Sequence, residues 1–62
     1  MAADAAARAY HAASQAHRSN NLPSAILWYE KALSLTPRDA PSYNGLAVAR
    51  RDTNDLKAAL AA

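Results

Sequence analysis

Turn-forming residues divide this chain into segments of helical length. Asn20-Asn21 makes the first break, because asparagine tolerates the left-handed conformation that ends helices. Thr36-Pro37 makes the second, since the residue before a proline is pushed out of the α region. A third break is predicted at Asp52-Thr53-Asn54-Asp55, where an asparagine again follows a helical segment. The chain is therefore predicted to be all-α, with three full helices and a short fourth at about 3–19, 22–35, 41–51 and 56–62.

Composition supports helices over strands. Alanine, the best helix former, accounts for 18 of the 62 residues, and β-branched residues are few. Pro23 and Pro41 fall where helices should begin, and proline is tolerated in a first turn because its missing N–H would have no partner there. Asp39 is the expected cap of the third helix. We expect antiparallel helix–turn–helix hairpins in one domain, 1–62.

The segment after the first break has the clearest helical periodicity. One face carries apolar residues at helical spacing, namely Leu22, Ala25, Ile26, Tyr29, Ala32 and Leu33. This face is predicted to be buried. Leu27 points away from it, and Trp28 and Leu35 lie on its flank, so these three form a candidate association surface. Partial burial of Trp28 against a neighbouring hairpin is the alternative.

Charge, hydrophobicity and cysteine content narrow the classes of function that this chain is expected to have. The net charge of +2 comes from scattered residues and does not favour nucleic-acid binding. No apolar run approaches the ~20 residues of a membrane span, and no signal peptide is visible. Without cysteine there is no disulfide or thiolate metal site. We expect a cytoplasmic protein that binds neither nucleic acid nor membrane.

Residues typical of catalysis are not grouped in the sequence. The two histidines, His11 and His17, are six residues apart, so they face different sides of one helix and do not share a metal easily. There is no grouping of acid, base and nucleophile, and no glycine-rich loop for a phosphate. We expect a non-enzyme without cofactor or metal.

The chain contains an internal repeat. A shift of 34 residues aligns Asn20 with Asn54 and Leu22 with Leu56. It also aligns Ala25 with Ala59 and Ile26 with Leu60, so an Asn-x-Leu-x-x-Ala-[Ile/Leu] string occurs twice. Helix–turn–helix units of this period are typical of helical repeat proteins.

The residues from Leu22 to Ala47 resemble the tetratricopeptide family, and the whole resemblance covers about one and a half repeats, residues 6–62. The positions that match the family pattern are Ala25, Tyr29, Ala32, Pro37, Tyr43, Leu46 and Ala47. The resemblance implies that alanines let the helices approach while Tyr29, Tyr43 and Leu46 fill the space between them. The first helix departs from the pattern, with Ala9, Ala12 and Ala16 where the family has large residues.

In that family the first helix of each hairpin lines a concave, ligand-binding groove. The register places Ala7, Tyr10, Ser14, His17 and Arg18 there from the first helix, and Asn44, Val48, Arg51 and the neighbouring Asp52 from the third. Amide, guanidinium and aromatic groups of this kind suit an extended peptide or helix of a partner protein. The same residues would otherwise form a solvated polar face.

Two further functions stay open. The chain is either a dimerisation or docking domain for a larger enzyme or complex, or a capping fragment of a longer repeat array. Stacked repeats need about three units for stability. We therefore expect this chain to be the N-terminal piece of a longer protein, or to be completed by self-association as a homo-oligomer.

Overall fold

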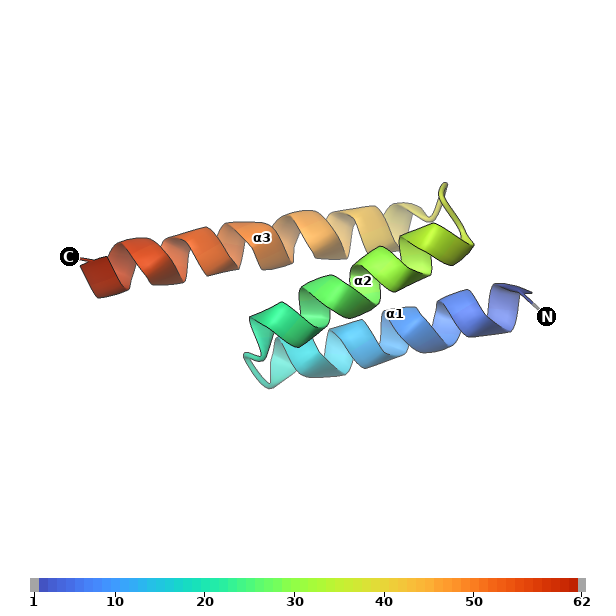
Figure 1. Ribbon diagram of the computed structural model, residues 1–62, viewed down its shortest axis with the longest axis horizontal. Helices are drawn as coiled ribbons and strands as arrows, with labels where there is room; N and C mark the ends of the chain where they lie inside the picture. The colour runs from blue at the N-terminus through green and yellow to red at the C-terminus, as the bar shows by residue number, and fades with distance from the viewer. Residues whose placement is uncertain (1, 62) are drawn as a thin grey trace.

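The computed structural model describes residues 2–61, with side chains from residue 5 onward, and forms three helices (Figure 1). These are α1 (Ala2–Arg18), α2 (Leu22–Leu35) and α3 (Ala40–Ala61). α2 packs against both α1 and α3, whereas α1 and α3 make few contacts with each other. The described part contains no strand, so the prediction of an all-α chain is confirmed.

The turn between α1 and α2 forms where the sequence predicts it. Asn20 has a φ of 61°, in the left-handed region. Its N–H donates to the carbonyl of His17 at 3.0 Å, and the N–H of Asn21 donates to that of Ala16 at 2.8 Å. This pair of bonds is a Schellman motif, which satisfies the last carbonyls of the helix. Pro23 then lies in the first turn of α2.

The turn between α2 and α3 also lies at its predicted place. The N–H of Thr36 makes the last helical bond, to Ala32 at 2.8 Å, and Pro37 follows outside the helix. Asp39 precedes α3 and accepts two bonds from its first turn. Its carbonyl takes the N–H of Tyr43 at 3.1 Å, and its carboxylate takes the buried hydroxyl of Ser42 at 2.5 Å.

Alanine lets α1 and α2 pack closely. The buried residues of α1 are Ala6, Ala9 and Ala13, and those of α2 include Ala25 and Ala32. Each of these side chains is at most 5% exposed. The expected core face of α2 is confirmed, with Leu22 and Tyr29 buried and Ile26 and Leu33 half-buried. α1 and α2 therefore meet through small side chains. On α1, alanines stand at positions where the repeat pattern has large residues.

α2 and α3 are held together around Tyr29. A Cβ added at Gly45, the chain's one glycine, would clash with the Tyr29 ring. A helix interior normally disfavours glycine by about 1 kcal/mol relative to alanine. At position 45 the Tyr29 ring lies so close to the backbone that glycine fits and a larger residue would clash. Leu46 and Ala49 complete the buried stripe of α3.

The predicted break after residue 51 and the separate fourth helix are not found. α3 continues through the expected break as one helix of 22 residues. Thr53 stays within the helix and donates its hydroxyl to the carbonyl of Ala49 at 2.9 Å. The second half of α3 projects beyond the turn between α1 and α2 (Figure 1). The predicted helix end at Ala62 lies outside the described residues.

The straight α3 also changes the expected packing of its first half. Leu46 is buried as predicted, but Tyr43 is 56% exposed and Ala47 is exposed. Tyr43 and Ala47 are four residues apart and so share one face of α3, which is exposed in the described part of the chain.

Candidate functional site: the groove beside α1

Four polar or aromatic residues follow one side of α1. Tyr10, Ser14 and His17 are half-buried, and Arg18 is exposed at the end of the helix. Their spacing of three and four residues places them on one stripe of the helix, as the sequence predicts. Two hollows lie along this stripe.

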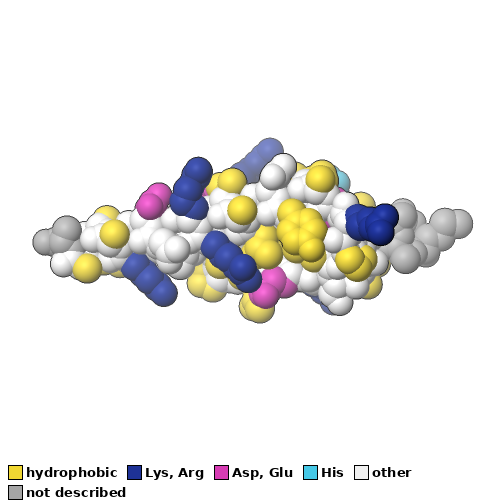
Figure 2. All heavy atoms as spheres, turned by 90° about the horizontal axis from the view of Figure 1, so that it is seen from above, with side chains coloured by type: hydrophobic (Ala, Val, Ile, Leu, Met, Phe, Trp, Pro, Cys, Tyr) yellow, Lys and Arg dark blue, Asp and Glu magenta, His cyan; other side chains and the backbone are white. Residues whose placement is uncertain are grey.

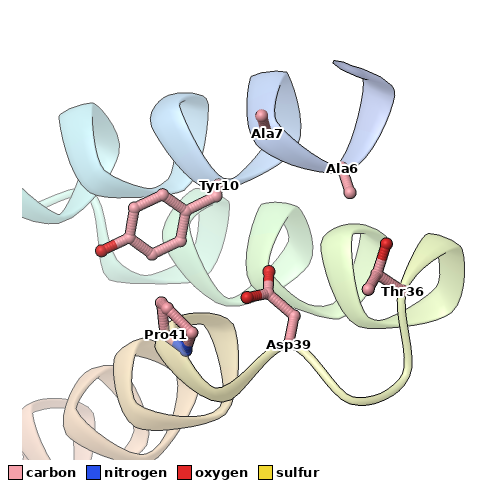
Figure 3. Close-up of a pocket in the computed structure, with 6 residues that line it drawn as sticks. All are labelled: Ala6, Ala7, Tyr10, Thr36, Asp39 and Pro41. Atoms are coloured by element: carbon pink, nitrogen blue, oxygen red, sulfur yellow. The ribbon is translucent and has the colours of Figure 1, made fainter. Parts of the chain in front are cut away.

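The first hollow lies at the end of the molecule where α2 turns into α3. It has a volume of about 310 Å³ and a mostly apolar lining, formed by Ala6, Ala7, Tyr10, Thr36, Asp39 and Pro41. Figure 3 shows Tyr10 extending from α1 toward Pro41, and Ala6 pointing toward the connecting loop. The sequence does not predict Thr36, Asp39 and Pro41 as lining residues, because only the fold of the loop brings them opposite α1.

The second hollow lies further along α1. It has a volume of about 270 Å³ and is lined by Ser14, His17, Arg18 and Tyr29. α3 reaches this region through Asp52, whose Oδ2 lies 2.9 Å from Nε2 of His17. A carboxylate accepts hydrogen bonds, so the imidazole N–H is the donor. The His17 and Asp52 side chains are 21% and 38% exposed, and the pair therefore lies at the edge of the solvent.

Tyr29 lines the second hollow, and its ring also lies near Tyr10, which lines the first. Its ring centroid lies 6.0 Å from that of Tyr10 and 6.3 Å from that of His17. The His17 contact is edge-to-face at 82°, a favourable arrangement for two rings. The same Tyr29 ring lies against the backbone of Gly45. One buried side chain of α2 therefore lies against both α1 and α3, in keeping with the packing role expected of Tyr29.

The predicted groove residues of α3 are less well placed. Asn44 and Arg51 are exposed, and Val48 is half-buried. None of the three lines either hollow. The third helix instead contributes Pro41 to the first hollow, and its Asp52 contacts His17, which lines the second. The two hollows are thus formed chiefly by α1, and α2 contributes Tyr29 to the second.

The predicted association surface lies on the opposite side of α2. Leu27 is 68% exposed, and Trp28 and Leu35 are each 39% exposed. A third hollow of about 280 Å³ is lined by Ser24, Leu27, Trp28 and Lys31. The ammonium of Lys31 lies 5.5 Å from the centroid of the Trp28 ring, within cation–π distance. Trp28 is thus partly covered by its own helix, while Leu27 is not.

Charged side chains are spread over the surface rather than concentrated. Figure 2 shows Lys and Arg side chains along the whole length of one face, with hydrophobic side chains gathered between them over its broad part. Arg50 and Glu30 form an exposed pair at 3.8 Å between α3 and α2, the kind of contact that contributes little to stability. Among the described residues, no three His, Cys, Asp or Glu side chains meet as a metal site.

None of the helices described for residues 2–61 combines the length and the apolar character needed to cross a membrane. Comparison with protein-family models, with characterised proteins and with solved structures finds no match for this chain. The surfaces that bear on function are therefore the groove beside α1 and the outer face of α2.

Proposed function

We propose that this chain is a non-catalytic interaction module that binds an extended peptide, or a helix, of a partner protein in the groove beside α1. The observation that carries the proposal is the pair of hollows in series, one mostly apolar at Tyr10 and one polar at His17. An apolar cavity next to a few convergent polar groups is the usual form of a binding site.

In this proposal the fold is a tetratricopeptide-like hairpin with a third helix beside it. The proposed location of the protein is the cytoplasm. Two features support this assignment. Ala25, Tyr29 and Ala32 of α2 are all buried where the family pattern places its packing residues, and Pro37 ends that hairpin. The absence of cysteine is compatible with a reducing compartment.

Selection of peptides from a random display library, followed by a blocking substitution, tests the groove. Ala7 lines the first hollow and is exposed, so Ala7→Trp fills the hollow without disturbing the core. We expect it to weaken the binding of selected peptides at least about tenfold, which corresponds to about 1.4 kcal/mol. Gln15→Trp is the matched control, because Gln15 is exposed on α1 but lines neither hollow. Equal binding by both variants would contradict the proposal.

An assembly or docking domain is the second candidate. It is favoured by the hollow at Leu27 and Trp28 and by the high exposure of Leu27. Light scattering of the wild type and of Leu27→Asp separates this candidate from the first. Assembly through α2 predicts an oligomer that dissociates in Leu27→Asp and persists in Ala58→Asp, a control at an exposed position of α3. A wild-type monomer at all concentrations would exclude assembly of this chain with itself through α2.

A further inference from the structure

The first hollow places a carboxylate beside an apolar wall. Asp39 is half-buried and lines this hollow together with the alanines and the tyrosine of α1. Figure 3 shows its carboxylate directed from the connecting loop toward α1, with Tyr10 and Thr36 on either side. Neither of the ion pairs found among the described residues includes Asp39. A charge that faces a hollow without a basic partner indicates a ligand of the opposite charge.

The structural role of Asp39 uses only part of its carboxylate. Oδ2 accepts the hydroxyl of Ser42, in the first turn of α3, at 2.5 Å. No side-chain hydrogen bond of the described residues involves Oδ1. Because an ionised carboxylate has about four acceptor positions, the cap of α3 leaves acceptor positions for a ligand.

We propose that the first hollow binds a primary alkylammonium group, with Asp39 as the anion that recognises it. The group would come from a lysine side chain of a partner protein or from a free alkylamine. The inference rests on the proposed function, because this hollow lies in the same groove. It adds the chemistry of the ligand at the loop end of the groove, a positive head on an aliphatic stem.

The rest of the lining suits such a ligand. Ala6 and Ala7 are small and apolar, so an aliphatic stem can lie against α1. The half-buried Tyr10 offers the face of its ring to a cation, and the hydroxyl of Thr36 offers a second acceptor. The volume of about 310 Å³ is at the lower end of the range for small-ligand sites.

The helix ends around the hollow also favour a cation. Thr36, which follows α2, lines the hollow, and the last turn of α2 contains no basic residue. The C-terminal end of a helix carries a partial negative charge. The N-terminus of α3 favours an anion, but Asp39 already supplies one. An anionic ligand would therefore meet a charge of its own sign.

An ammonium fits this site better than a guanidinium. Arginine binds a carboxylate most strongly through two parallel bonds, which use both oxygens. Because Oδ2 of Asp39 accepts the Ser42 hydroxyl, Oδ1 is the oxygen open to a ligand. An ammonium is a compact charge that needs one oxygen. We therefore expect lysine to bind more tightly than arginine.

Capped amino acids test the site directly. The probes are the N-acetyl methylamides of lysine, norleucine and arginine, together with n-butylamine. Norleucine has the aliphatic stem of lysine without the charge. Each probe is titrated by NMR into the full chain, observing the methyl signals of Ala6 and Ala7 and the ring signals of Tyr10. The methyl signals of Leu27 are the internal control, because Leu27 lines the third hollow on the outer face of α2.

We expect the lysine probe to bind at least about fivefold more tightly than the norleucine probe, from a partly exposed ion pair together with a cation–π contact. Asp39→Asn should remove this preference, because asparagine still caps α3 but carries no charge. Asp55→Asn is the matched control, since it removes the same charge from an exposed position of α3 that lines neither hollow. Tighter binding of the lysine probe than of n-butylamine assigns the ammonium to a protein side chain, and equal binding assigns it to a free amine.

Equal binding of the lysine and norleucine probes by the wild-type chain would overturn the cation site while leaving an apolar hollow in the groove. An Asp39→Asn variant that is folded by circular dichroism and keeps the preference would overturn it as well. So would an equal loss in Asp55→Asn, which would be an effect of net charge. Tighter binding of arginine than of lysine would overturn the assignment to an ammonium.

A second measurement does not depend on any variant. Added sodium chloride should weaken the binding of the lysine probe and leave that of the norleucine probe unchanged, because salt screens a partly exposed charge. Lysine binding that is insensitive to salt would contradict the role of Asp39. If none of the probes binds, the cation site is excluded. The library peptides and Ala7→Trp then decide separately whether the groove itself binds peptides.

Discussion

The string Asn-x-Leu-x-x-Ala-[Ile/Leu] occurs twice in this chain, and its two copies lie in different environments. In the first copy, at the start of α2, Leu22 is 4% exposed and Ala25 is fully buried. In the second, near the end of α3, Leu56 is 45% exposed and Leu60 is 79% exposed. The comparison shows that the repeated string is compatible with a buried hairpin but does not impose one.

The position that differs most between the two copies is the one after the leucine. Pro23 stands in the first copy and Lys57 in the second. A proline there cannot continue α1, because it lacks the N–H for the bond to the fourth residue before it and its ring clashes with that carbonyl. Lysine is a good helix former and continues α3. Asn20 therefore marks a helix end and Asn54 does not, although the asparagines are equivalent.

The largest expected effect comes from truncating the two leucines. Leu22→Ala removes a buried side chain and should lower the free energy of unfolding by about 2–5 kcal/mol. Leu56→Ala changes a side chain that is largely in water, and we expect less than about 1 kcal/mol. Urea denaturation followed by far-UV circular dichroism measures both. Equal losses would mean that Leu56 is covered in solution.

A proline at position 57 should make the second copy resemble the first. Lys57→Pro removes a helical hydrogen bond and disfavours the local helix by about 3 kcal/mol. We expect lost hydrogen-exchange protection at residues 54–56 with the hairpin of α1 and α2 unchanged, because that part of α3 lies beyond it. Lys57→Ala is the control and should keep α3 intact. Unchanged protection in the proline variant would refute this account.

The smallest effects should come from the two asparagines, and they should have opposite signs. Asn20→Ala places a Cβ-bearing residue without a compensating polar side chain at a φ of 61°, which costs about 1 kcal/mol. Asn54→Ala replaces a weak helix former within α3 and should stabilise the helix by about 0.5 kcal/mol. Thermal unfolding measures the two shifts. Asn20→Gly should show no loss, because glycine accepts this conformation.

Much of the hairpin could be predicted from the sequence because its signals are local. The ends of α2 follow from Asn20-Asn21 and Thr36-Pro37, and its buried face follows from the helical spacing of its apolar residues. The predicted end of the third helix near residue 51 is wrong, because α3 continues through Asn54. Asparagine alone does not end a helix, and only the first copy has a proline after its leucine.

The groove was predicted in part. The stripe of α1 from Tyr10 to Arg18 lies along two hollows, as expected from spacing and resemblance. Register and helical spacing also predict Asn44 and Arg51 as lining residues, but they line neither hollow. The lining contributed by Pro41 depends on how the loop at 36–39 folds back beside α1. No local sequence pattern predicts where this loop lies relative to α1.

The sequence by itself determined the helical class, both turns and the buried face of α2, because steric limits on proline and the helical period act within a few residues. Only the tertiary structure decided that Tyr43 is exposed, and that His17 meets Asp52, 35 residues away. The second contact depends on the placement of α3 across α2. The Tyr29 ring lies close to the backbone of Gly45 in that placement, a long-range fit that sequence spacing does not encode.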